Sequence, residues 1–271
     1  MRPSLLKKGD KVRVISPSGK VEENKIKLAC KVLEAWGLNV EFGLHAFDVY
    51  NKLAGEDEDR ASDLQQALDD DSVKAVFCSR GGYGLVRIID SIDFTKFKKN
   101  PKWVIGFSDV TVLHNHINEL GIATLHAPMP NSFESTPQIA MDSLKNALFD
   151  SDYQIPNPFG NEEIVGGNLA IIYSLLGTNS DLDTKGKILL LEDIGEYAYN
   201  IDRMIFALKK AGKFEGIKGL LVGQFSGIKD DNFGFSVKEI IENCISDYDF
   251  PIYYDIPVGH VDDNRAVVLG K

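Results

Sequence analysis

Cysteine, long apolar runs and clustered positive charge are all scarce in this sequence of 271 residues. Its three cysteines, Cys30, Cys78 and Cys244, are odd in number and lack the spacing of metal ligands, so we expect free thiols in a reducing compartment. Nowhere do eighteen apolar residues run together, and the opening MRPSLLKKGDKVRVIS has no apolar segment before its lysines. These absences predict a soluble, cytoplasmic protein without a signal peptide or a membrane partner.

Basic residues are outnumbered, with 30 Lys and Arg against 40 Asp and Glu and a formal net charge of −10. The Lys and Arg residues are scattered rather than gathered in one tract, so we expect no nucleic-acid partner. The phosphate-binding patterns G-x-G-x-x-G and G-x-x-x-x-G-K-[ST] are both missing. Their absence argues against a dinucleotide site or a P-loop.

The first half of the chain alternates strand and helix patterns. The segments KVRVIS, NVEFG and VKAVFC have the apolar content of strands, and residues 21–36 carry an apolar stripe at helical spacing that ends at Gly37. The charged segment GEDEDR is expected to be solvated surface. This order predicts an α/β fold whose N-terminal sheet is mainly parallel and flanked by helices.

A change of composition divides the chain. Residues 151–167, SDYQIPNPFGNEEIVGG, are rich in Pro, Asn and Gly and are interpreted as a linker. Residues 1–150 would then form the N-terminal domain, and residues 168–271 a second, smaller α/β domain that contains the strand patterns KILLLE and GLLVGQF.

A serine lies at the corner of WVIGFSDVTVLHNHI, where a buried strand pattern meets an amphipathic helix pattern. Ser108 at this turn has two interpretations. It could be an ordinary helix N-cap, or it could be a nucleophile lifted above the sheet edge on a strand-to-helix turn. The G-x-S-x-G pattern of such nucleophiles is missing, so the segment alone leaves both open.

A serine nucleophile requires a general base, and the sequence has five histidines. His260, in PVGHVDDN after a strand-like segment, is the preferred base. His126 ends a strand pattern beside APMP and is the second candidate. His114 and His116 follow the serine on its helix and are expected to be packed or solvated, while His45 lies in a polar loop.

The base in turn requires a carboxylate that fixes its tautomer. Glu192 ends the buried strand pattern ILLLE, at the edge of a parallel sheet where α/β proteins build their sites. Asp193 and Glu196 follow it, but Glu196 and Asp202 suit the start of the next helix better. We therefore prefer Glu192.

Backbone donors for an oxyanion are expected after Ser108 and in the loop CSRGGYG. The N–H of Asp109 would be one donor, and the N–H of Gly82 the other. Gly81 and Gly82 let the main chain approach a ligand closely because they have no Cβ. Arg80 could bind a substrate carboxylate, although it could equally brace the glycine loop.

These segments together resemble the L,D-carboxypeptidase family of serine peptidases, which includes muropeptide-recycling enzymes and microcin C immunity peptidases. The resemblance rests on VISPSG, SRGGYGLVRIID, NPKWVIGFSDVTVLH, TLHAPM, VGGNLAIIYSLLGT, GKILLLEDIGEYAYNIDRMI and IPVGHVDDN, which span nearly the whole chain. It implies a Ser108 nucleophile, a Glu192 carboxylate and a His260 base in a two-domain, commonly dimeric enzyme without a metal or cofactor. Similar proteins continue beyond the final NRAVVLGK.

The resemblance implies acyl transfer that releases a terminal D-amino acid from an L,D-linked murein peptide, with Arg80 and Gly81 in contact with the substrate. One alternative is an immunity hydrolase that cleaves a peptide–nucleotide amide. Another is a non-catalytic ligand-binding protein on the same scaffold, which would be favoured if His260 were turned away from Ser108.

Overall fold

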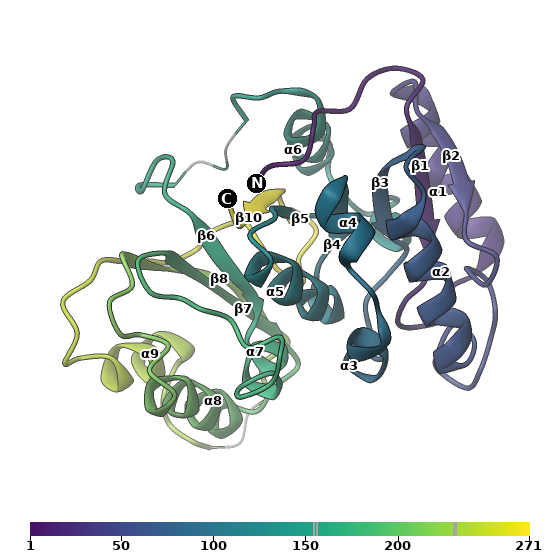
Figure 1. Cartoon of the computed structure of the whole chain (residues 1–271). Helices are drawn as coiled ribbons and strands as arrows, with labels where there is room; N and C mark the ends of the chain where they lie inside the picture. Colours follow the sequence, from purple (N-terminus) through teal and green to yellow (C-terminus); the bar gives the residue numbers. More distant parts are fainter. Residues whose placement is uncertain (154, 156, 230–231) are drawn as a thin grey trace.

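The computed structural model describes residues 1–153, 155, 157–229 and 232–271. Its strands form a six-stranded sheet in the order β10-β5-β4-β3-β1-β2 and a four-stranded sheet in the order β6-β7-β8-β9 (Figure 1). The strands are β1 Lys11–Ile15, β2 Asn39–Phe42, β3 Val73–Cys78, β4 Trp103–Gly106, β5 Thr124–His126, β6 Ile164–Asn168, β7 Ile188–Ile194, β8 Gly219–Ser226, β9 Ile252–Tyr253 and β10 Val267–Leu269. Among the named strands of the described residues, only β10 pairs antiparallel, with β5. The predicted fold class is confirmed.

Helices cover both faces of the six-stranded sheet. Alternate strand residues point to opposite faces, so Phe77 and Ile105 pack with one group of helices while Val76 and Val104 pack with the other. The first group is α1 Glu23–Ala35 and α6 Gln138–Phe149, and the second is α2 Asp57–Asp69, α3 Leu85–Ile88, α4 Thr95–Lys99 and α5 Thr111–Glu119. The central strand β4 is apolar along its whole length because both of its faces are buried.

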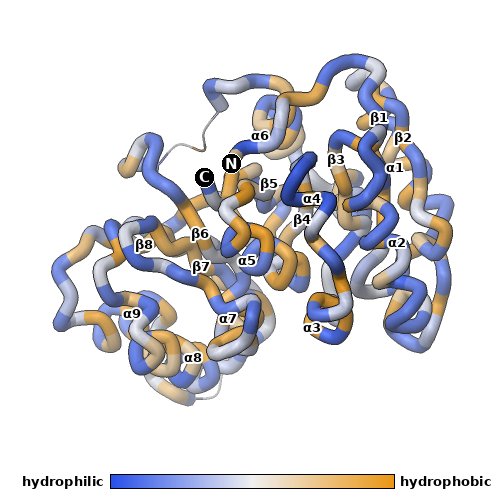
Figure 2. The backbone as a smooth tube through the Cα atoms, in the orientation of Figure 1, coloured by the Kyte–Doolittle hydropathy of each residue, from blue (hydrophilic) through white to orange (hydrophobic). Residues whose placement is uncertain are grey.

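The four-stranded sheet has helices on one face and the C-terminal segment on the other. Its helices are α7 Leu169–Ser174, α8 Ala198–Lys210 and α9 Val237–Cys244, which share one apolar core with Leu189 and Leu191. Leu190 and Leu221 face the other way and pack with Val267 and Leu269 of β10. Figure 2 colours the backbone by hydropathy, and apolar and hydrophilic stretches alternate along helices such as α5 and α8.

Part of the predicted linker is a strand. β6 begins at Ile164, inside the segment 151–167, of which residues 154 and 156 lie outside the described residues. Gly166 and Gly167 have φ of 127° and 132°, and a Cβ on them would lie 2.1 Å from the Leu190 oxygen and 2.7 Å from Thr111 Oγ1. The glycines that suggested a loop therefore permit a close approach between neighbouring strands and to α5.

The segment GEDEDR is not simply solvated surface. Glu56 and Asp59 form a capping box that starts α2. Arg60, only 1% exposed, donates to the backbone oxygens of Pro17 and Gly55 at 3.2 and 2.8 Å. Its guanidinium therefore joins α2 to the loop after β1.

The three cysteines agree with the expectation of free thiols. Cys30, Cys78 and Cys244 are free thiols and buried. Across the ranges that the structure describes, no helix is both long enough and apolar enough to span a bilayer.

Candidate active site

A cavity of about 330 Å³ lies where β4 and β7 end, between loops of the two sheets. The carboxyl edge of parallel strands is the common place for sites in α/β proteins. The cavity is lined by Arg80, Gly81, Gly82, Phe107, Ser108, Met129, Asn131, Ser132, Ile194 and His260. Five side chains or backbone positions singled out from the sequence thus meet around one space.

Ser108 follows β4 in a left-handed turn, with φ of 65°. A residue with a Cβ is held in such a conformation at a cost of about 1–3 kcal/mol, and this strain is concentrated at functional sites. Its hydroxyl caps no helix and makes no hydrogen bond with the residues that the structure describes. The N-cap interpretation is therefore wrong, and the hydroxyl is available to the cavity.

Two glycines make room for this turn. A Cβ at Gly81 would lie 2.9 Å from the Cβ of Ser108, and a Cβ at Gly106 would lie 2.8 Å from Val110 Cγ2. Side chains at either position would push Ser108 or the start of α5 away. The glycine loop and the serine turn are thus in direct contact.

The side chain of Asp109 fixes the two loops to each other. It is buried, and its Oδ2 accepts hydrogen bonds from Ser18 Oγ at 2.6 Å and from the N–H of Leu85, the first residue of α3, at 3.0 Å. Burial raises the pKa of the Asp109 carboxyl, and these hydrogen bonds oppose that rise. Asp109 therefore holds the serine turn, the loop after β1 and the start of α3 in one arrangement.

Glu192 and His260 form a hydrogen-bonded pair. Glu192 lies in β7 with no exposed surface, and its Oε2 accepts a hydrogen bond from His260 Nδ1 at 3.0 Å. His260 follows Gly259, where φ is 128° and a Cβ would lie 3.0 Å from the same oxygen. Because Nδ1 donates to the carboxylate, Nε2 is the nitrogen free to accept a proton.

The His260 loop is fixed on several sides. The Phe107 ring packs edge-on against the imidazole at 4.9 Å between centroids. Ser226 Oγ donates to the backbone oxygen of His260 at 3.0 Å, and the N–H of Gly259 donates to Asn264 Oδ1 at 3.0 Å. The residue before Ser108 thus contacts the imidazole directly.

The N–H groups of Gly82 and Asp109 are both free of hydrogen bonds to the described residues. Gly82 has φ of 116°, and a Cβ at the neighbouring Gly81 would lie 3.3 Å from the Asp109 nitrogen. Two unused backbone donors beside a serine are the parts of an oxyanion hole.

Arg80 extends from the glycine loop into the cavity lining. Its Nη1 donates to the backbone oxygen of Lys20 at 3.1 Å, and no carboxylate of the described residues forms an ion pair with it. Most of its donors are therefore available for an anion.

The other two acids have different partners. Glu196 accepts a hydrogen bond from Asn200 Nδ2 at 3.1 Å near the start of α8. Asp193 is buried and accepts from Asn168 Nδ2 and from the N–H of Ala170, both at 3.0 Å. Burial is the main cause that raises the pKa of Asp193 to about 6.

Asn168, at the end of β6, links the four-stranded sheet to α5. Its N–H donates to Thr111 Oγ1, in the helix after Ser108, at 3.1 Å. Its side chain bonds to Asp193, the neighbour of Glu192. The helix after Ser108 and the strand that carries Glu192 are therefore connected by a short chain of hydrogen bonds. Sequence reasoning missed this chain because Asn168 directly follows the predicted linker and carries no periodic signal.

The remaining histidines do not line the cavity. His126, the second candidate base, is fully buried with its ring 5.6 Å from that of Phe107, and burial lowers its pKa well below the usual range. His114 Nε2 hydrogen-bonds to the Gly106 oxygen at 2.8 Å, and burial lowers the pKa of His114 to about 4. His116 Nδ1 lies 2.9 Å from Ser180 Oγ.

The lining also includes residues that the sequence did not single out. Met129, Asn131 and Ser132 follow β5, and Ile194 ends β7. The segment APMPNS after a strand pattern was the available signal, since loops at this edge of a sheet supply site residues.

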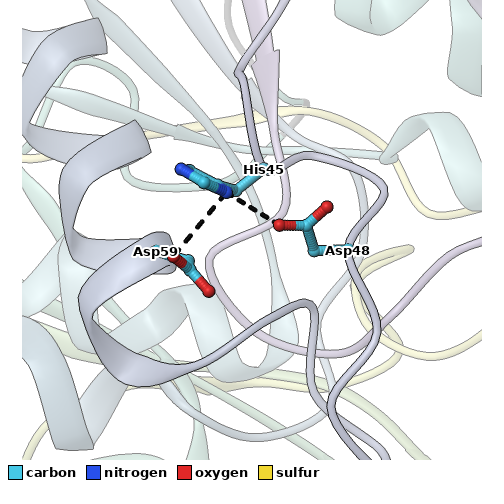
Figure 3. A group of neighbouring side chains, drawn as sticks. All are labelled: His45, Asp48 and Asp59. Atoms are coloured by element: carbon cyan, nitrogen blue, oxygen red, sulfur yellow. Dashed lines mark hydrogen bonds and ion pairs between the residues drawn. The ribbon is translucent and has the colours of Figure 1, made fainter.

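His45, Asp48 and Asp59 form the cluster with metal-ligand chemistry in the described ranges (Figure 3). His45 Nδ1 lies 2.7 Å from Asp48 Oδ2 and 3.7 Å from Asp59 Oδ1. The Asp48 hydrogen bond is the main cause that raises the pKa of His45. The contacts of the imidazole with the two carboxylates account for the arrangement, and none of the three residues lines the cavity.

The chain matches two family domains. Residues 12–127 match the LD-carboxypeptidase N-terminal domain, and residues 162–271 match the LD-carboxypeptidase C-terminal domain. The chain belongs to the LD-carboxypeptidase family. This finding confirms the resemblance inferred from the sequence segments.

Individual LD-carboxypeptidase relatives agree. A probable murein peptide carboxypeptidase of Bacillus subtilis is 34% identical, over 99% of this chain and 89% of the relative. The crystal structure of muramoyltetrapeptide carboxypeptidase from Oxalobacter formigenes has a TM-score of 0.85 and 26% identity, and covers 96% of this chain and 92% of its own. The microcin C7 self-immunity protein MccF in complex with aspartyl sulfamoyl adenosine has a TM-score of 0.90 at 18% identity, over 100% and 94% of the two chains, and shows the shared fold.

Proposed function

We propose that this LD-carboxypeptidase family member is a serine peptidase that releases a terminal D-amino acid from an L,D-linked murein peptide. The observation that carries the proposal is that Ser108 and His260 line one cavity, while Glu192 is hydrogen-bonded to Nδ1 of the His260 imidazole. The names of its murein peptide and muramoyltetrapeptide carboxypeptidase relatives support this substrate class.

In the proposed reaction, His260 Nε2 takes the proton of Ser108 as the hydroxyl oxygen attacks the amide carbonyl. The N–H groups of Asp109 and Gly82 hold the resulting oxyanion. His260 then gives its proton to the leaving amine as the C–N bond breaks, which leaves an ester on Ser108. Water attacks this ester with His260 again as base, and Glu192 stabilises the imidazolium in both halves.

Arg80 and Gly81 are the proposed substrate contacts. The Arg80 guanidinium can form paired hydrogen bonds with the terminal carboxylate of the substrate. Gly81 lets the peptide pass close to Ser108, because a Cβ at this position would fill the space beside the serine. A carboxypeptidase requires such a carboxylate contact to distinguish a chain end from an internal bond.

The alternatives predict other results. A non-catalytic binding protein would be favoured by a His260 turned away from Ser108, whereas here both residues line one cavity. An immunity hydrolase would cleave an aminoacyl–nucleotide amide faster than a murein peptide.

The test is a side-by-side assay of a tetrapeptide with a terminal L,D bond, its all-L and D,D counterparts, and an aminoacyl sulfamoyl adenosine, analysed by mass spectrometry. We expect D-alanine from the L,D peptide alone, with discrimination of about 10⁴. Ser108→Ala protein is the blank. Cleavage of the nucleotide conjugate without D-alanine release would contradict the murein assignment, and no cleavage of any substrate would support the binding protein.

The proposal also places the enzyme in the cytoplasm as a homodimer. The three buried free thiols support a reducing compartment. The dimer rests on the family resemblance, and sedimentation of the purified protein tests it.

A further inference from the structure

A second cavity, of about 530 Å³, adjoins the candidate active site beyond the glycine loop. We call it the Lys52 groove, and it is lined by Gly19, Asn51, Lys52, Leu53, Arg80, Gly82 and Tyr83. Arg80 and Gly82 also line the cavity that contains Ser108. The two cavities are therefore neighbours across the proposed oxyanion hole.

The groove has a backbone floor and an apolar side. The N–H of Gly19 donates to the Gly81 oxygen at 3.2 Å, and a Cβ at Gly19 would lie 3.0 Å from that oxygen and 3.2 Å from Arg80 Nε. Bridges join Leu53 to Gly19 and to Tyr50, so the loop that carries Lys52 is held in place. The Tyr83 ring is 54% exposed. A peptide chain can lie on this floor against the aromatic ring.

The charged side chains that line the groove are positive and form no ion pairs. Lys52 and Arg80 are the charged residues of the lining, and neither forms an ion pair within the described ranges. Arg87, on the helix after the glycine loop, is by contrast neutralised by Asp57, with Nε 2.8 Å from Oδ2. In a protein of net charge −10, two unpaired cations around one groove favour an anionic ligand.

We infer that the Lys52 groove binds the acyl side of the peptide substrate and that Lys52 pairs with a carboxylate there. This inference rests on the proposed function. The leaving amine must meet His260, which lines the Ser108 cavity and not the groove. The leaving residue therefore occupies the Ser108 cavity, and the remaining peptide extends past Arg80 and Gly82 into the groove. The groove thus selects acidic peptides.

The test compares L-Ala-γ-D-Glu-L-Lys-D-Ala with the peptide in which the free α-carboxylate of D-Glu is a carboxamide. Binding of both peptides is measured by calorimetry on Ser108→Ala protein, which does not consume them. We expect the acidic peptide to bind about fivefold more tightly, as for an exposed ion pair, and Lys52→Gln in the same background to abolish this preference. Lys98→Gln, an exposed and unpaired lysine on α4, is the matched control and should retain it.

Equal binding of the two peptides to Ser108→Ala protein, or a preference that survives Lys52→Gln, would overturn the inference. Turnover by the wild-type protein is measured separately. Turnover without a Lys52-dependent preference refutes the groove and leaves the proposed function standing. A Lys52-dependent preference without turnover refutes the proposed function and supports the groove as a peptide site.

Discussion

Gly259→Ala tests whether the backbone beside His260 sets the position of the imidazole. The φ of Gly259 is 128°, a conformation that L side chains rarely adopt. A Cβ there would lie 3.0 Å from both Glu192 Oε2 and the Gln224 oxygen, and 3.2 Å from Glu192 Cβ. Two of these atoms belong to Glu192, whose carboxylate binds His260. An added methyl group must therefore shift the loop or the carboxylate.

Two effects of different size are expected. The backbone strain should lower the free energy of unfolding by about 1–3 kcal/mol, measured by urea denaturation. A displacement of the imidazole by about 1 Å should lower kcat for D-alanine release about 10²-fold, because proton transfer depends on that geometry. KM should change little, since Gly259 does not line the cavity.

The matched control is Gly121→Ala. Gly121 follows α5 with φ of 75°, and a Cβ there would meet nothing within 4 Å. Its variant should lose about 1–2 kcal/mol of stability and keep full kcat. Full kcat in Gly259→Ala, or an equal loss of kcat in both variants, would refute the idea that this glycine positions the base through Glu192.

Other substitutions separate the remaining roles. Glu192→Gln should lower kcat by orders of magnitude and Glu196→Gln only slightly; the reverse order in folded proteins would transfer the orienting role to Glu196. His260→Ala should abolish turnover while His114→Ala, which removes a buried hydrogen bond, should mainly lower stability by about 2 kcal/mol, so a selective loss of kcat in His114→Ala would contradict the choice of base. Because the pKa of Asp193 is raised in the folded protein to about 6, its contribution to stability is present below about pH 4 and lost as the pH rises through about 6. The free energy of unfolding in urea should show this loss, up to about 3 kcal/mol, in the wild type and not in Asp193→Asn. The same dependence of this free energy on pH in both proteins would exclude the contribution of Asp193.

The elements and the strand ends were predictable from local patterns. A doubly buried strand such as Trp103–Gly106 is apolar throughout, and the polar residues that follow it must lie at the sheet edge. This reasoning located Ser108, Glu192 and the glycine loop. It could not decide whether Ser108 caps a helix or directs its hydroxyl into a cavity. The answer depends on the φ angle of Ser108 and on its contact with Gly81, which is distant in sequence.

Long-range contacts account for the other differences. His126 ends β5 at the same sheet edge as the cavity, yet its side chain is buried against the Phe107 ring. Gly167 ends the predicted linker and Asn168 follows it, and their roles emerge only from their contacts with Thr111 and Asp193. Arg60 belongs to a charged segment, but it is buried because backbone oxygens accept its hydrogen bonds. Such partners lie far apart in the sequence and leave no periodic signal.

The return of β10 to the six-stranded sheet governs when the candidate site can be completed during synthesis. His260 lies between β9, in one sheet, and β10, in the other. A ribosome releases the N-terminal part first, so the serine turn can fold before His260 has been synthesised. His260 is held between the two sheets once Val267–Leu269 pair with Thr124–His126. A nascent chain therefore carries the serine turn without the imidazole beside it until β10 has been synthesised.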